Sequence, residues 1–66
     1  MVEYYILETA DGWLFKQPGF IQPITRFKSR KEALEYVRRL EKQGEIFVRL
    51  QDMTGHWQTV TSDGDN

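Results

Sequence analysis

The chain has 66 residues, of which 39% are hydrophobic and 29% are charged, so it builds one small core with little room for a deep active-site pocket. Nine basic and ten acidic residues give a formal net charge of −1, which provides no overall positive field to attract nucleic acid or anionic lipid. The absence of cysteine excludes disulfides, thiol catalysis and cysteine-based zinc sites.

The first segment predicts a β-hairpin. Residues 2–8 are rich in β-branched and aromatic side chains, which favour a strand. Asp11 and Gly12 follow, and this pair is typical of a hairpin turn because glycine tolerates the positive φ that such turns require. We therefore expect residues 13–16 to form the returning strand.

A segment with two prolines comes next. Pro18 and Pro23 lack the amide donor that a central strand requires, so residues 17–23 predict a loop or an irregular edge. Residues 24–28 then predict a third strand.

The middle of the chain predicts one amphipathic helix. Ser29 and Glu32 match a capping box, in which the serine oxygen accepts an amide at the helix start and the glutamate reaches back to the serine amide. The helix is thus expected to begin at Arg30, and Gly44 is expected to end it. Its apolar stripe has i, i+3, i+4, i+7 spacing and consists of Ala33, Tyr36, Val37 and Leu40.

The last part of the chain predicts a second hairpin. Residues 45–51 alternate between apolar and other side chains, which indicates a half-buried strand. Residues 52–55 predict a turn, and residues 56–61 predict the partner strand. Residues 62–66 contain no apolar side chain, so we expect a disordered tail after a single domain that covers residues 1–61.

These elements predict an α+β fold, in which an antiparallel sheet of four to five strands, in the order β-β-β-α-β-β, has one helix packed on one face. A single helix leaves the other face of the sheet open. The nine aromatic residues of the chain are too many to be hidden beneath one helix, so some are expected to face outward.

The exposed aromatic residues predict a surface that binds a protein partner. The residues expected on the uncovered sheet face are Trp13, Phe47, Arg49 and Trp57. Phe20 and Ile21 lie between the two prolines, which lower the entropy lost when a loop docks, so this tip is a candidate recognition element. Two alternatives stay open: the tryptophans belong to the core, and Phe20 folds back to cap the core edge.

A cluster of basic residues predicts a second kind of surface. Its members, at the end of the third strand and the start of the helix, are Arg26, Lys28, Arg30 and Lys31. These side chains and free helix amides suit contact with phosphates. All nine basic residues lie between positions 16 and 49, and the acidic ends of the chain argue against nonspecific affinity for nucleic acid. The alternative interpretation is a solvated polar face with dispersed ion pairs.

No arrangement of residues indicates catalysis. His56 is the only histidine and has no neighbouring metal ligands, so we expect no metal site. Paired catalytic carboxylates, a glycine-rich phosphate loop and a nucleophile elbow are also absent. We therefore expect neither enzymatic activity nor a cofactor.

We expect a cytoplasmic location. The longest apolar runs are far shorter than the roughly 18 residues that span a bilayer. The N-terminus, with Glu3 and no basic start, is unlike a signal peptide, and the lack of cysteine fits a reducing compartment.

The order of motifs resembles a family of short bacterial proteins classified as a domain of unknown function. The residues that carry the resemblance are Asp11-Gly12-Trp13, Lys16, Phe27, Ser29, Lys31-Glu32-Ala33, Leu40, Gly44, Val48 and Asp52. The likeness covers roughly residues 3–60. It implies a compact α+β fold, found in bacteria and their phages, with no established activity and no catalytic residue to transfer.

A weaker likeness links Phe27, Lys31, Glu32 and Ala33 to the N-terminal DNA-binding modules of tyrosine recombinases. Those modules touch DNA with the face of their sheet and end at the helix, whereas a further hairpin follows here.

The sequence therefore predicts a non-enzymatic interaction module, a bacterial or phage accessory protein that docks onto another protein or a second copy of itself. The docking surface would be the open sheet face or the loop from Pro18 to Pro23. The alternative is a nucleic-acid-binding module that uses the basic cluster.

Overall fold

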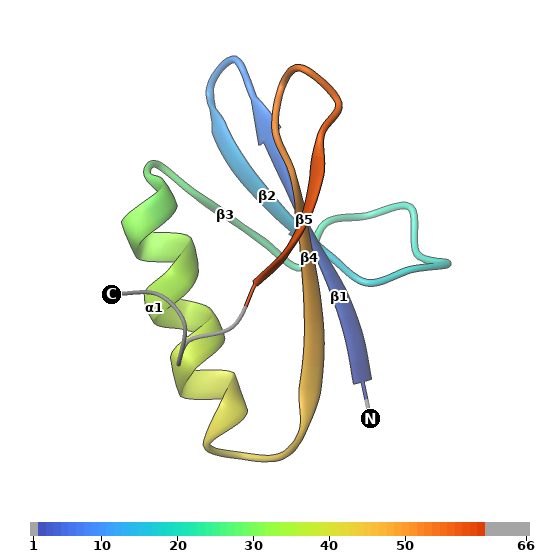
Figure 1. The fold of residues 1–66 in the computed structure, drawn as a ribbon, viewed down its shortest axis with the longest axis vertical. Coiled ribbons are helices and arrows are strands. Elements are labelled where there is room, and N and C mark those ends of the chain that lie inside the picture. Colours follow the sequence, from blue (N-terminus) through green and yellow to red (C-terminus); the bar gives the residue numbers. More distant parts are fainter. Residues whose placement is uncertain (1, 61–66) are drawn as a thin grey trace.

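In a computed structural model, which describes residues 2–60, one helix lies against a five-stranded sheet (Figure 1). The elements are β1 (Val2–Thr9), β2 (Gly12–Lys16), β3 (Thr25–Phe27), α1 (Arg30–Glu41), β4 (Ile46–Gln51) and β5 (Trp57–Val60). The predicted α+β fold and its order of elements are confirmed. The predicted tail, residues 62–66, lies outside the described residues.

The sheet is mixed rather than wholly antiparallel. Its strand order is β3-β2-β1-β4-β5, and every neighbouring pair is antiparallel except β1 and β4, which are parallel. The expectation of an antiparallel sheet is wrong at this one pair. The cause is α1, which leads the chain from edge strand β3 back across the sheet, so that β4 enters beside β1 in the same direction. The N-terminal strand is therefore the central one.

The first hairpin depends on a glycine. Gly12 has φ +145°, a conformation that other residues rarely adopt. A Cβ at this position would also collide with the backbone carbonyl oxygen of Phe27 on β3. Gly12 thus allows β2 to begin directly after the turn and β3 to pair closely with it.

The start of α1 is fixed by Ser29. Its Oγ accepts a hydrogen bond from the Glu32 amide at 3.2 Å, which confirms the predicted N-cap. The Glu32 carboxylate accepts the amide of Lys28 at 2.9 Å instead of the Ser29 amide, so the reciprocal bond reaches one residue further back than predicted. Both bonds satisfy amides near the start of the helix.

The helix ends earlier than predicted, at Glu41, with Lys42 as its C-cap. Gln43 donates its amide to the Leu40 carbonyl at 2.9 Å, and Gly44 donates to Glu41 at 3.3 Å. These bonds span three residues and replace the last helical bonds with a turn.

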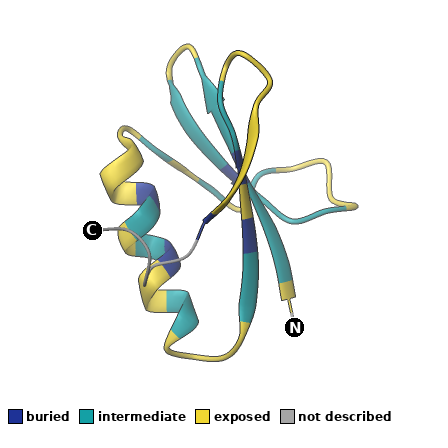
Figure 2. Ribbon diagram, in the orientation of Figure 1, coloured by how far each residue is buried: buried dark blue, intermediate teal, exposed yellow. Residues whose placement is uncertain are grey.

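The core lies between α1 and one face of the sheet. The buried side chains are Ile6, Phe15, Ala33, Val37, Val48, Leu50 and Val60. Figure 2 shows the buried segments of α1 on its side nearest the sheet. Phe15 is at the centre, with its ring stacked on Tyr4 at 4.8 Å and meeting the edge of Tyr36 at 5.1 Å. This packing fixes which side of every strand faces the helix.

Candidate binding surface

The open face is the side of the sheet that points away from α1. Ile6, Phe15 and Leu50 face the helix, and successive strand residues point to opposite sides, so their neighbours point away from it. The residues that define the open face are Glu3, Tyr5, Leu7, Leu14, Lys16, Arg26, Phe47, Arg49 and Trp57. This face combines apolar, aromatic and basic side chains.

Aromatic rings gather over β1, β4 and β5. The ring of Tyr5 meets that of Trp57 edge to face at 5.3 Å, and Trp57 is 47% exposed. The guanidinium of Arg49 lies 5.6 Å from the ring centre of Phe47, within range of a cation–π contact. The predicted placement of Phe47, Arg49 and Trp57 on the uncovered face is what the structure has.

Basic side chains alternate with these rings. Tyr5 is paired in register with Lys16 on one side and with Arg49 on the other. Arg26 lies opposite Leu14, further toward the β3 edge. Arg49 Nε also lies 4.0 Å from a carboxylate oxygen of Glu3, and both side chains are about half exposed, so this ion pair contributes little to stability.

Five residues of the open face were not among those selected from the sequence: Glu3, Tyr5, Leu7, Leu14 and Lys16. Tyr5 and Lys16 occupy the centre of the open face, but each belongs to a segment whose sequence indicates a strand and no binding site. The alternation of side chains along a strand places both residues on the open face, because Tyr5 adjoins the core residue Ile6 and Lys16 adjoins the core residue Phe15.

Trp13 does not belong to the open face. It pairs with Phe27 and shares the side of β2 that carries Phe15, where it packs against the core. The expectation that both tryptophans face outward is therefore wrong for Trp13, because the period of two along a strand places Trp13 and Phe15 together.

The loop between β2 and β3 presents an apolar tip. Figure 1 shows it projecting from the side of the sheet opposite α1. Phe20 is 62% exposed and Ile21 is 90% exposed, so the alternative in which Phe20 caps the core is wrong. We call residues 17–23 the proline loop.

The proline loop is held at both ends. The Phe20 amide donates to the Gln17 carbonyl at 3.1 Å across Pro18 and Gly19, and Gly19 has φ +86°, as a type II turn requires. The amide of Ile24 donates to the Phe15 carbonyl at 2.7 Å. The apolar tip thus sits on a fixed base.

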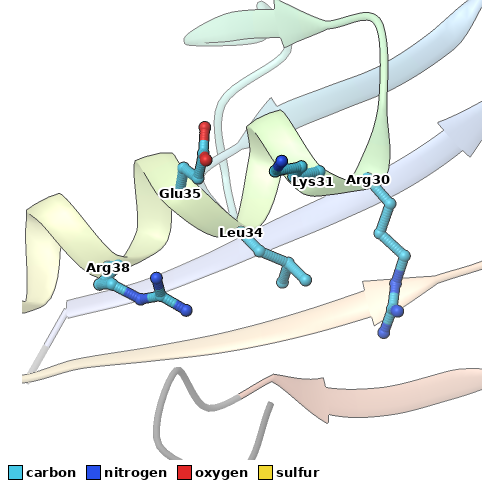
Figure 3. A pocket seen from close by; sticks show the side chains of 5 residues that line it. All are labelled: Arg30, Lys31, Leu34, Glu35 and Arg38. Carbon is cyan, nitrogen blue, oxygen red and sulfur yellow. The ribbon is translucent and has the colours of Figure 1, made fainter. Parts of the chain in front are cut away.

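The basic cluster predicted from sequence is divided by the fold. Arg26 is on the open face, whereas Arg30 and Lys31 belong to α1, on the other side of the sheet. Arg30, Lys31, Leu34, Glu35 and Arg38 line a groove of about 340 Å³ along the helix. Figure 3 shows Arg30, Leu34 and Arg38 pointing to one side of α1 and Glu35 to the other. Lys28 is exposed between β3 and α1.

A polar network closes the hairpin between β4 and β5. Asp52 Oδ1 accepts the hydroxyl of Thr54 at 2.6 Å and the amides of Thr54 and His56 at 2.9 and 3.1 Å. The Thr54 hydroxyl also lies 2.9 Å from His56 Nδ1. The Thr54 hydroxyl bond, together with the two amide bonds, lowers the pKa of Asp52 below its ordinary value. These contacts are local to the turn.

Two kinds of feature are absent from the part of the chain that the structure describes. Within residues 2–60, no three or more acidic or histidine side chains form a group able to hold a metal ion. In the same range, no helix has the length and apolar character needed to cross a membrane.

Comparison with known families adds one finding. The family model of an uncharacterized protein conserved in bacteria, DUF2188, matches residues 4–62. The chain belongs to the DUF2188 family. This membership confirms the bacterial family of unknown function that the Gly-Trp turn and the Lys-Glu-Ala helix indicate. The description of DUF2188 assigns no enzymatic activity, and no significant match to a curated protein or a solved structure is found.

Proposed function

We propose that this protein is a non-enzymatic interaction module that docks onto a protein partner through its open face and its proline loop. The observation that carries the proposal is that apolar and aromatic side chains are exposed to solvent on one side of the molecule. Trp57 is exposed on the sheet, and Phe20 and Ile21 are exposed on the loop that projects from the same side. Exposed apolar and aromatic anchors of this kind are typical of interfaces.

The chemistry of the described residues supports binding rather than catalysis. No polar or charged side chain among residues 2–60 is buried, whereas catalytic groups are usually tuned by burial and close charge partners. The carboxylate with a shifted pKa, Asp52, is committed to the turn that it closes.

Position-specific crosslinking tests this function. Thr59 pairs in register with Arg49 and is on the same side of β5 as Trp57. A photoreactive amino acid placed at Thr59 or at Ile21 should capture the same partner in the native host. Lys42 is the matched control, because it is exposed beyond the end of α1. Capture from Lys42 equal to that from Thr59 and Ile21, or no capture from those two, would contradict the proposal.

A second candidate function has one observation in its favour. Lys16 and Arg49 flank the ring of Tyr5 on the open face, and rings with adjacent cations suit stacking on bases and contact with phosphates. Titration with single-stranded and duplex oligonucleotides at low ionic strength tests it, because electrostatic binding is strongest there. Absence of binding under those conditions would end this alternative.

A further inference from the structure

The open face has a charge opposite to that of the whole chain. The protein has a formal net charge of −1, yet the open face carries the cations Lys16, Arg26 and Arg49 against one carboxylate, Glu3. We infer that the partner of this face is an acidic segment of another protein, in which apolar side chains alternate with carboxylates. This inference rests on the proposed function and names the chemistry of the partner.

A row of residues across the middle of the sheet predicts the spacing of acidic and apolar residues in the partner segment. Lys16, Tyr5 and Arg49 lie side by side on β2, β1 and β4. Because neighbouring strands are about 4.8 Å apart, the two cations are anchored about 10 Å apart with a ring between them. In an extended chain, acidic residues at i and i+4 are about 13 Å apart, with the residue at i+2 facing the same way. The long Lys16 and Arg49 side chains cover that difference, and an apolar residue at i+2 meets Tyr5.

In the unbound protein, Glu3 forms an ion pair with Arg49, one of the two cations. Its carboxylate is 4.0 Å from Arg49 Nε, at the limit of an ion pair, and both groups are open to solvent. An incoming carboxylate therefore competes with Glu3 for Arg49. Loss of the Glu3 charge strengthens binding of an acidic segment and weakens binding of a basic one, and this sign separates the two classes of partner.

Other occupants fit the same face less well. A second copy docked face to face about a two-fold axis would bring two sets of the cations Lys16, Arg26 and Arg49 together, with only Glu3 to offset them. Nucleic acid requires several free phosphate contacts, whereas Arg49 is shared with Glu3 and the adjacent loop tip is apolar at Phe20 and Ile21. An acidic, partly apolar polypeptide uses both the cations and the loop.

The test is a titration followed by NMR of the labelled chain. The probe is the synthetic peptide Glu-Ser-Leu-Ser-Glu-Ser-Phe-Ser-Glu, with matched peptides in which lysine or glutamine replaces every glutamate. The acidic peptide should shift the amides of β1 and β4 and the Trp57 indole, and its affinity should fall as salt rises. Arg49→Gln and Lys16→Gln should each weaken it about threefold, and Glu3→Gln should strengthen it by a similar factor. Lys42→Gln, beyond α1, should leave it unchanged.

Several outcomes would overturn the inference. Equal affinity for the lysine peptide and the acidic peptide would show that the face does not select by charge, and that result rejects an acidic partner. Weaker binding in Glu3→Gln also rejects it. A nine-nucleotide thymidine oligomer that binds more tightly than the peptide assigns the face to nucleic acid. A dimer in sedimentation that Arg49→Gln stabilises assigns it to a second copy.

The crosslinking experiment separates this inference from the proposed function. If no peptide binds while crosslinks from Thr59 and Ile21 persist, the acidic chemistry fails and the docking function stands. If those crosslinks are also absent, both fail.

Discussion

Asp52 shows how one side chain outside the core organises a turn. Its Oδ1 accepts three hydrogen bonds from Thr54 and His56, and ionisation strengthens each of them. The turn that leads into Trp57 therefore depends on a charge that lies outside the core. Because β5 carries Trp57, the turn also sets the position of one ring of the open face.

The pH dependence of stability should reveal this charge. The folded pKa of Asp52 lies below the ordinary 3.8, so its contribution is present above that value and is lost as pH falls through the folded pKa. We expect Asp52→Asn to be less stable than the parent chain above pH 3.8 and the difference in Tm to shrink below it. Thermal denaturation across that range measures the effect.

Removal of the Thr54 hydroxyl provides the control for this prediction. Thr54→Val deletes the largest cause of the shift, so the pKa of Asp52 measured by NMR should rise toward 3.8. A pKa that stays low in Thr54→Val would assign the shift to the backbone amides alone.

At the scale of the element, α1 depends on its N-cap. Ser29→Ala should lower the free energy of unfolding by about 1 kcal/mol, because the Glu32 amide loses its acceptor. Urea denaturation measures the loss. Ser29→Asp, which supplies an acceptor of the same reach, should retain most of the stability, and equal losses in the two variants would show that the cap bond is unimportant.

The elements themselves were predictable because their signals are local. The Ser29 cap, the apolar stripe through Ala33 and Val37, and the Asp11-Gly12 hairpin signal each act within a few residues, and the elements that they predict are confirmed. The parallel pairing of β1 with β4 was not predictable in this way. It depends on where a crossover places a strand relative to a distant partner, which no short window of sequence contains.

The candidate surface was predictable only in part, for a related reason. Phe47 and Arg49 follow the alternation of a six-residue strand, and the structure has them on the open face. Trp13 is expected on the open face from its residue type, but it lies two positions from the core residue Phe15 and therefore on the same side of β2. Phe20 and Ile21 are expected at an exposed tip and are exposed, but the sequence leaves open that Phe20 caps the core edge, because its position depends on how the proline loop leaves the sheet.

At the scale of the whole molecule, the helix divides the two tryptophans between different roles. Trp13 packs against the core under α1, whereas Trp57 lies on the open face. Trp13→Ala should lower the free energy of unfolding by about 2–3 kcal/mol through loss of buried contacts. Trp57→Ala should cost about 1 kcal/mol, since it loses mainly the contact with Tyr5.

Chemical denaturation of both variants measures the contrast, and partner capture gives the complementary result. Trp57→Ala should abolish crosslinking from Ile21 while the protein stays folded. A loss of stability in Trp57→Ala as large as that in Trp13→Ala would place Trp57 in the core and remove its part in docking.

The central position of β1 also has a consequence for synthesis of the protein. β1 is translated before β4, so β1 pairs on one side with β2 while on its other side Tyr4 has no partner until Val48 of β4 is made. Until that late segment emerges, the nascent hairpin carries an unsatisfied row of backbone groups, which chaperones or neighbouring chains are able to bind. A chain that stops before β4 therefore exposes one edge of β1, the strand at the middle of the complete sheet.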